Sequence, residues 1–246
     1  MKALKWFGIS IGIIVVVLVI GLGYLGFIPG VSNLFGSNKP KDLGVTYTVA
    51  DYTSARNKVG GNLSVLPSTS DPTQSISFSG SHPVDVNFTE AEYNAELNNR
   101  QWSYYPLENV QVKLHTDGTA ELSANIETGK LQGCLEALGA SQDALTSVTN
   151  YLKYIPTNPA IYMKGSVEIE NGQFLNTDMA TFKVGNLDLT GQIQNNLSQI
   201  ISGGESTFNY IPGFSIKTFQ IVNIGGNPGI HFVGTEPDCA RSIVSP

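Results

Sequence analysis

Residues that commonly carry catalysis or bind metals are scarce in this sequence. Its 246 residues include only 3 histidines and 2 cysteines, and the histidines, His82, His115 and His231, stand apart from one another. No stretch has the ligand spacing of a metal site, a Gly-x-Ser-x-Gly nucleophile elbow or a phosphate-binding loop. Because catalysis needs several such groups in a defined arrangement, we predict a protein that is not an enzyme and that uses no metal or other cofactor.

Acidic residues are absent from the first part of the chain. None precedes Asp42, whereas Lys2 and Lys5 open the sequence. The whole chain has 20 acidic and 14 basic side chains, so the part that follows Asp42 is clearly acidic. A nucleic-acid partner requires a basic surface to neutralise its phosphates, and we therefore expect no nucleic-acid partner.

Charge is missing altogether from residues 6–28. At 1.5 Å per residue this run is long enough to cross about 30 Å of hydrocarbon. A cleavable signal peptide has an apolar core of only about 7 to 15 residues and a small-residue cleavage site. We predict an uncleaved transmembrane anchor, with a cleaved signal as the alternative. Because the positive charges precede it, residues 1–5 should be a cytoplasmic tip and the rest should lie outside the membrane, in the cell envelope.

The only cysteines, Cys134 and Cys239, both lie in the predicted exported part. In an oxidising compartment we expect them to form one disulfide that joins the middle of the domain to its tail. Closing a loop of about a hundred residues would add roughly 4 to 5 kcal/mol of stability in the chain-entropy model. The alternative is two buried free thiols.

Composition divides the remaining chain into four parts. Residues 29–41 are rich in Gly, Ser, Asn and Pro, as is typical of a juxtamembrane spacer. Residues 42–61 should form a short helical unit capped by Thr48. Residues 62–83 are mostly Ser, Thr and Pro and predict a partly packed connector, with short apolar pieces that could add an edge strand. Residues 84–246 are long enough for one substantial domain.

The most regular local pattern starts at Thr89. Thr89 and Glu92 have the spacing of a capping box, in which each side chain bonds the backbone N–H of the other residue. Strict alternation of apolar residues over residues 110–126, interrupted by Asp117-Gly118, predicts a tight β-hairpin. This stretch is therefore expected to be a capped helix followed by two paired strands.

Further helices and hairpins follow in alternation. We expect helices at residues 131–138 and 141–155, a hairpin around Asn171-Gly172 with a bulge near Thr177 or Asp178, a helix ending at Gly203-Gly204, and a hairpin that turns at residues 225–229. This order predicts an α+β fold in which helices cover one face of an antiparallel sheet.

Several segments resemble one known family. The stretches FTEAEYNAELNNR, VQVKLHTDGTAELSANI, GSVEIENGQF, FKVGNLDL and FQIVNIGGNPGIHFVGTEP, behind an apolar anchor, are similar to the YpmS-like membrane-anchored bacterial branch of the tubular lipid-binding (TULIP) superfamily. The resemblance covers Val84 to Pro237. It implies an N-terminal transmembrane helix followed by a curved antiparallel sheet of hairpins wrapped on a long helix, and it implies lipid binding, with transfer or sensing of the lipid as its use.

A lipid tail is the partner that this resemblance implies, besides the bilayer around residues 6–28. Each methylene moved out of water contributes about 0.8 kcal/mol, so a chain of about sixteen carbons gains roughly 10 kcal/mol or more before ordering costs. Alternation locates an apolar face, but it does not distinguish a lipid-lined face from an ordinary packed core. The residues expected to line the lipid site are Tyr93, Leu97, Val110, Val112, Leu122, Ile161, Met163, Val167, Phe182, Val184, Ile193, Leu197, Phe219 and Phe232.

The alternative function is a non-enzymatic cell-envelope scaffold or surface structural protein with a filled core. An N-terminal apolar helix ahead of a β-rich domain fits that function too. The two differ in the interior, because a scaffold should have a packed core whereas a carrier should have an open apolar groove along its long helix.

Overall fold

The computed structural model describes residues 36–140, 158–198 and 211–243, together with the single positions 32, 142, 145, 146, 149 and 201. The predicted cytoplasmic tip at residues 1–5 and the predicted anchor at residues 6–28 lie outside these residues, as does most of the predicted helix at 141–155. Within the described part, every helix is too short or too polar to pass through a bilayer.

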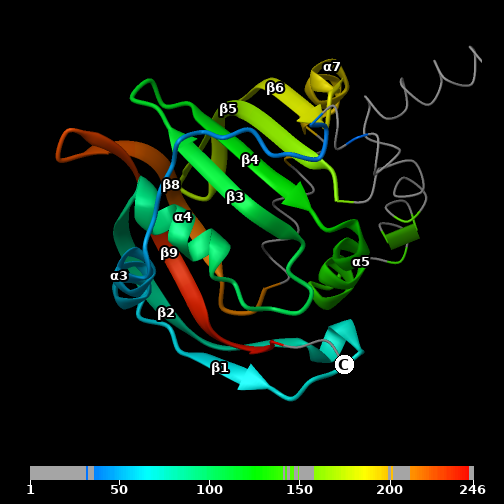
Figure 1. Ribbon diagram of the computed structural model, residues 1–246. Coiled ribbons are helices and arrows are strands. Elements are labelled where there is room, and N and C mark those ends of the chain that lie inside the picture. Colours follow the sequence, from blue (N-terminus) through cyan, green and yellow to red (C-terminus); the bar gives the residue numbers. More distant parts are fainter. Residues whose placement is uncertain are drawn as a thin grey trace, which may run out of the picture.

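The described residues form an α+β fold with one large curved sheet and a few short helices (Figure 1). The strands are β1 (Leu63–Leu66), β2 (Ile76–Thr89), β3 (Leu107–Leu114), β4 (Ala120–Ile126), β5 (Ala160–Glu170), β6 (Gln173–Val184), β7 (Leu187–Asp188), β8 (Ser215–Ile224) and β9 (Asn227–Ser242). The helices are α3 (Val49–Val59), α4 (Glu90–Asn98), α5 (Thr128–Ala137) and α7 (Thr190–Asn195), with a 3-10 turn η1 (Pro72–Gln74). The predicted α+β class with a curved sheet is confirmed.

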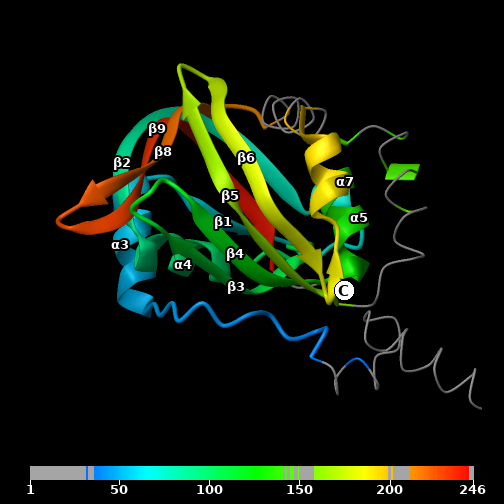
Figure 2. The same ribbon diagram turned by 90° about the horizontal axis from the view of Figure 1, so that it is seen from above.

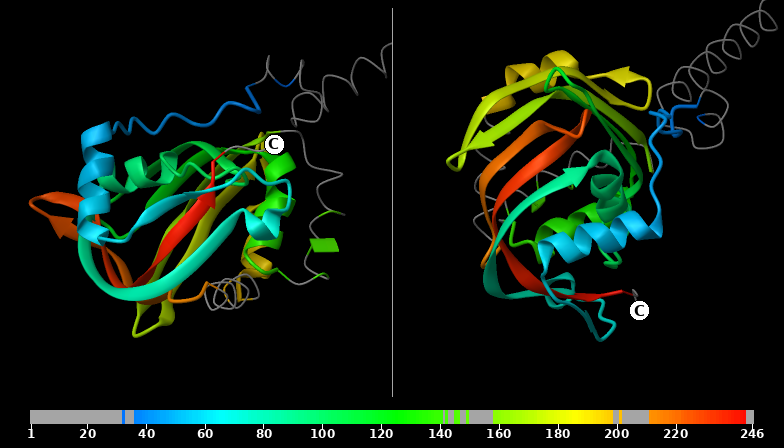
Figure 3. Two further views of the ribbon diagram at one scale, coloured as in Figure 1. Left: turned by 90° about the horizontal axis from the view of Figure 1, so that it is seen from below. Right: turned by 90° about the vertical axis from the view of Figure 1, so that its left-hand side faces the viewer.

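The sheet bends at β5. Its strand order is β1-β9-β8-β5-β4-β3, while β2 also pairs with β9 and β6 takes the other edge of β5. β5 pairs with β4 through residues 160–165 but with β8 only at Ile169 and Glu170. β4 and β8 therefore diverge from the same edge of β5, and the two arms of the sheet face each other across a concave side (Figure 3).

Helices α3 and α4 both begin where the sequence predicts. The Thr48 hydroxyl accepts the Asp51 N–H and the Thr89 hydroxyl accepts the Glu92 N–H, and the Asp51 and Glu92 carboxylates in turn accept the two cap N–H groups. These reciprocal hydrogen bonds satisfy donors that a helix start otherwise leaves unpaired. Both helices contact β2, and they pack on each other.

One edge of the sheet is closed by side chains of α4 and not by another strand. The Asn94 side chain, fully buried, accepts the Val112 N–H at 2.7 Å and donates to the Val112 carbonyl at 2.8 Å. Asn98 makes the same pair of bonds with Val110, at 3.0 and 2.8 Å, and Glu90 accepts the Leu114 N–H at 2.7 Å. Residues four apart share one helix face and residues two apart share one strand edge, so α4 takes the place of a neighbouring strand along β3.

The predicted hairpins are also present. β3 and β4 turn at Asp117-Gly118, and β5 and β6 turn at Asn171 and Gly172, whose φ angles of 52° and 76° are the positive values that such a turn requires. Ser166 pairs with Asp178 and Glu168 pairs with Leu175, so one residue of β5 faces two residues of β6. One of these two β6 residues is Thr177, so the predicted bulge is confirmed.

The predicted connector at residues 62–83 is strand over much of its length. Its two apolar pieces form β1 and the start of β2, as allowed for, but β2 continues through residues 76–83 and pairs with β9 along nearly its whole length. The second strand of the last hairpin, β9, continues to Ser242. Both strands are stabilised by pairing with a distant segment, and that partner leaves no trace in a local pattern rich in Ser and Gly.

The predicted long helix is not found in the described part of the chain, where the longest helix is α3 with 11 residues. The curved sheet closes instead on α3 and α4, two short helices that pack side by side. Their start signals are separated by a Gly-Gly pair and by β2, so no single helix could run through both caps.

The predicted disulfide is wrong, because both cysteines are free thiols. Cys134 lies on α5, which packs against η1, whereas Cys239 lies in β9 with Leu63 and Phe78 as its neighbours on the adjacent strands. Cys134 is a buried thiol that is only 8% exposed. Burial raises the pKa of this thiol to about 11, so it stays protonated. The alternative of free thiols therefore holds.

Candidate functional site

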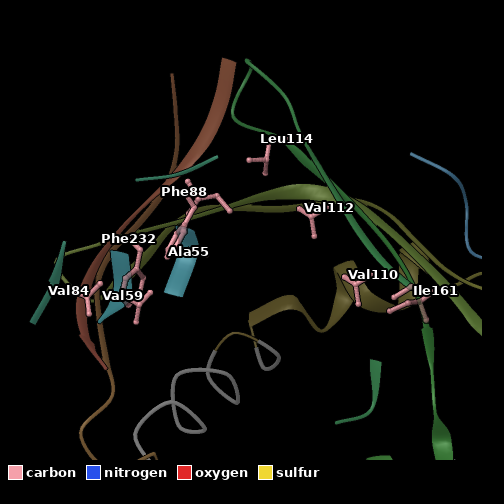
Figure 4. Close-up of a cluster of buried hydrophobic side chains, with 11 residues drawn as sticks. Ala55, Val59, Val84, Phe88, Val110, Val112, Leu114, Ile161 and Phe232 are labelled. Atoms are coloured by element: carbon pink, nitrogen blue, oxygen red, sulfur yellow. The ribbon is translucent and has the colours of Figure 1, made fainter. Parts of the chain in front are cut away.

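The two arms of the sheet meet in one hydrophobic core. Phe88, Val84 and Phe232 project from β2 and β9 on one side, and Val110 and Val112 project from β3 on the other (Figure 4). All of these side chains are less than a tenth exposed. The core therefore fixes the distance between the arms and holds the concave side in its shape.

Most of the predicted lipid-lining residues come together on the concave face. Val112, Leu122, Met163 and Phe182 are successive neighbours across β3, β4, β5 and β6, and Ile161 and Val184 are paired in the next row. Directly opposed residues on neighbouring strands place their side chains on the same face. The alternation in the sequence thus identifies one continuous apolar face.

The degree of burial divides the predicted residues into three groups. Val110, Val112, Ile161 and Phe232 are buried core residues, while Tyr93, Leu97, Leu122, Val184 and Phe219 are partly buried and pack against that core. Met163, Val167, Phe182, Ile193 and Leu197 lie outside the cluster, on β5, β6 and the α7 region. Val167 is 37% exposed, because it faces the bulge near the tip of the β5–β6 hairpin.

Aromatic rings connect α4 to the opposite arm of the sheet. The ring centroids of Tyr93 and Phe219 are 6.4 Å apart, and those of Phe214 and Phe232 are also 6.4 Å apart and stacked at 18°. Phe219 and Phe232 are cross-strand neighbours in β8 and β9. The inner face of α4 and the β8–β9 hairpin therefore share one aromatic cluster, within the range where such pairs are favourable.

Charged residues adjoin this aromatic cluster. Arg56 contacts Glu96 at 3.4 Å between Nη1 and Oε1, and its Nη2 donates to the Gly61 carbonyl at 3.0 Å. The second carboxylate oxygen of Glu96 and the hydroxyl of Tyr105 are buried without a hydrogen-bond partner. Arg100 is exposed, and its guanidinium makes no hydrogen bond or ion pair among the residues described. We call Arg56, Glu96, Arg100, Tyr105 and Glu236 the polar cluster.

The members of the polar cluster influence one another electrostatically. Desolvation raises the pKa of Glu236, and the charges of Arg56 and Arg100 oppose that shift. Desolvation is also the largest influence on Arg100 and lowers its pKa, but the neighbouring Tyr105, Glu96, Tyr93 and Glu236 outweigh it and the net shift is upward. Arg100 thus lies close to several polar and acidic side chains and is still exposed to solvent.

Sequence reasoning missed the polar cluster, although one signal was present. Tyr93 and Leu97 share one apolar stripe of α4, and the charged Arg100 follows two residues after that helix ends at Asn98. Glu236 lies in β9, and its even spacing from Phe232 places both residues on the same face of the strand. The sequence alone does not show that Arg100 and Glu236 lie close together.

The N-terminal segment of the described chain crosses the convex side of the sheet. Lys41 Nζ lies 2.7 Å from a Glu121 carboxylate oxygen and 4.2 Å above the Tyr162 ring, and the Leu43 N–H donates to Gln111 at 2.7 Å. Glu121, Tyr162 and Gln111 alternate with the apolar residues of β4, β5 and β3, so they face away from them. Figure 2 shows this extended segment running from α3 past β3. We call residues 38–48 the strap.

Two cavities lie away from the predicted lining residues. One of about 220 Å³ is bordered by Gln132, Glu136 and Leu145 near α5. The other, of about 340 Å³, lies at the start of α4 beside the strap and the β8–β9 turn, with Thr89, Lys113 and Asn227 among its lining residues. Polar side chains predominate in both, so neither is the predicted lipid channel.

Comparisons with protein-family profiles, with curated proteins and with solved structures gave no match. The concave face and the residues that line it are therefore the features of this chain that bear on its function.

Proposed function

We propose that this protein is a membrane-anchored, extracytoplasmic lipid-binding protein of TULIP-like fold that holds an acyl chain against its concave face. The observation that carries the proposal is the incomplete burial of the apolar rows. Leu122, Met163, Phe182 and Val184 are all only partly buried although they lie on the inner face. An acyl chain that covers this apolar area contributes about 25 cal/mol of binding free energy per Å² removed from water. Binding of this kind needs no catalytic group.

The strap supports a location close to the membrane. Residue 38 is already attached to the sheet, because the Asn125 side chain donates to the Asn38 carbonyl at 2.8 Å. Only about ten residues separate it from the end of the predicted anchor, and ten residues span at most about 35 Å. A domain on so short a tether, with an N-terminus in the cytoplasm, would remain next to the outer surface of the bilayer.

Native mass spectrometry of residues 36–246, expressed with membranes present, tests the proposal. This chain keeps the strap and omits the predicted anchor, so a recovered lipid cannot be one bound by the anchor. We expect a co-purified lipid that is lost from Met163→Glu, which places a charge in an apolar row. Thr181→Glu, on the opposite face of β6, should retain the lipid, and circular dichroism should show that both variants are folded. Lipid-free wild-type protein would contradict the proposal.

A second candidate function is a cell-envelope scaffold with a filled interior. It is favoured by the complete burial of Val110, Val112, Ile161 and Phe232, which behave as ordinary core residues. For a scaffold, the wild-type domain should be recovered without lipid and Met163→Glu should change only stability. The same mass spectrometry experiment therefore separates the two functions.

A further inference from the structure

Arg100 is a charged group without a partner in the described part of the chain. Arg56, the nearest comparable residue, is held by Glu96 and by the Gly61 carbonyl. Arg100 has no such contacts, although it lies within electrostatic range of Tyr105, Glu96 and Glu236. A guanidinium presents a planar set of donors that matches the two oxygens of a carboxylate or phosphate. Its free donors therefore suit an oxyanion.

Two further polar atoms beside Arg100 also lack partners. The Tyr105 hydroxyl and the Oε2 atom of Glu96 are buried and make no hydrogen bond with any residue that the structure describes. Buried polar atoms in native proteins nearly always have a partner, and an exception indicates a missing water or ligand. The hydroxyl can donate to an oxyanion, while the carboxylate oxygen can accept from a ligand hydroxyl.

The acidic neighbours do not prevent an anion from binding. Arg56 lies 3.4 Å from the other oxygen of Glu96 and offsets its charge. Desolvation raises the pKa of Glu236, which favours its neutral form. Tyr93, Cys239 and His82 are further titratable groups close to Arg100 or Glu236, and His82 contacts the Val59 carbonyl at 3.0 Å through Nε2. Among the residues described, Arg100 is thus a cation that has acidic neighbours but no ion pair or hydrogen bond of its guanidinium.

The polar cluster lies at a fixed distance from the aromatic cluster. Tyr93 lies in the first half of α4, and Arg100 lies two residues beyond the last residue of that helix, Asn98. Phe232 and Glu236 are four residues apart along β9, about 13 Å at 3.3 Å per residue. Both elements therefore change from apolar to charged in the same direction, as the tail and the head of one amphiphile require.

We propose that Arg100 and Tyr105 bind the headgroup of a single-chain amphiphile that ends in an oxyanion, either a carboxylate or a phosphate, and that Glu96 accepts a hydrogen bond from a hydroxyl group where the headgroup carries one. This inference rests on the proposed function, since the acyl chain is taken to lie on the concave face. A fatty acid and a lysophosphatidic acid carry the two forms of this headgroup, and an alcohol of the same chain length lacks the charge.

Photo-crosslinking with the full chain in phosphatidylcholine nanodiscs tests the proposal. Three sixteen-carbon diazirine probes are compared: the fatty acid, the lysophosphatidic acid and the alcohol. We expect Arg100→Gln to reduce labelling by at least one anionic probe about tenfold, the effect of losing a charge-assisted hydrogen bond, and to leave labelling by the alcohol unchanged. Arg100→Lys should retain an intermediate yield, and Lys217→Gln, which removes an exposed charge elsewhere, should match the wild type.

The outcomes separate this inference from the proposed function. If no probe labels the wild-type domain, both fail. If all probes label it and Arg100→Gln lowers every yield alike or none, the lipid-binding function stands and the headgroup site is refuted. Whichever anionic probe labels more strongly identifies the headgroup. Should Arg100→Gln not fold, Arg100→Lys and Tyr105→Phe carry the same test, because each keeps the size of the side chain.

Discussion

Replacing Asn94 with alanine should destabilise the protein more than any other single amide change on α4. Asn94 is fully buried and bonds both backbone groups of Val112 as well as the Glu90 carbonyl at 2.7 Å. Alanine cannot replace these bonds, and α4 would still shield the edge of β3 from water. The Val112 N–H and C=O would then be buried and unpaired.

The magnitude follows from those two groups. A buried donor or acceptor that loses its partner costs about 1 to 3 kcal/mol, so the loss of two partners in Asn94→Ala should lower the free energy of unfolding by about 2 to 6 kcal/mol. A domain of this size has roughly 5 to 15 kcal/mol in total. Asn98 makes equivalent bonds to Val110 but is only partly buried, and water can replace part of what is lost, so Asn98→Ala should cost about 1 to 2 kcal/mol.

Urea denaturation of residues 36–246, followed by far-ultraviolet circular dichroism, measures these differences. Asn99→Ala is the matched control, because its side chain makes a single bond, to the Ala95 carbonyl at 2.7 Å, and should cost less than about 1 kcal/mol. We expect the loss in the free energy of unfolding to decrease in the order Asn94→Ala, Asn98→Ala, Asn99→Ala. An Asn94→Ala variant as stable as Asn99→Ala would refute the view that α4 completes the hydrogen bonding of β3.

Three further predictions concern the convex face, the sheet and the thiols. Gly165→Ala should cost about 1 to 3 kcal/mol in urea denaturation, because a Cβ atom there would collide with the backbone of Asp178; Gly129→Ala, with open space around it, should not destabilise. Hydrogen bonds from Lys41, Tyr162 and His115 lower the pKa of Glu121 from 4.5 to about 2. Because the pKa is lowered, the carboxylate stabilises the fold above about pH 4.5, and this contribution disappears as the pH falls toward 2. The free energy of unfolding of the wild type should therefore be larger than that of Glu121→Gln by about 1 kcal/mol at pH 7 and almost equal to it at pH 2. Thiol titration of unreduced, unfolded protein should find both Cys134 and Cys239 free, and in the native state the burial that raises the pKa of Cys134 to about 11 should make it slow to react at pH 8; no titratable thiol after unfolding would instead indicate a disulfide.

The sequence was informative wherever neighbouring residues decide the conformation. The helix starts at Thr48 and Thr89 were predictable because a capping box closes within four residues. The turns at Asp117-Gly118 and Asn171-Gly172 were predictable because few residues tolerate positive φ. The apolar face of β3, β4 and β5 followed from a period of two, which needs no knowledge of the partner strand.

Prediction failed where a residue depends on a distant segment. Residues 76–83 carry only a short apolar piece at their start, and the rest of the segment becomes part of β2 because β9 pairs with it. Cys134 and Cys239 could be counted in the sequence, but only the tertiary structure shows that both are free thiols. The polar cluster is assembled from α3, α4, the following loop and β9, and no spacing in the sequence relates those four elements.

By itself, the sequence determined the local elements, the acidic character of the chain after Asp42 and the identity of its apolar face, since each of these depends on residue type and short-range geometry. Only the tertiary structure decided that the face curves, that α4 closes the edge of β3 and that Arg100, near Glu96 and Tyr105, has no ion-pair partner among the described residues. The reason is that long-range pairing and desolvation are properties of groups far apart in the chain, and their free energies exist only once the two arms of the sheet have come together.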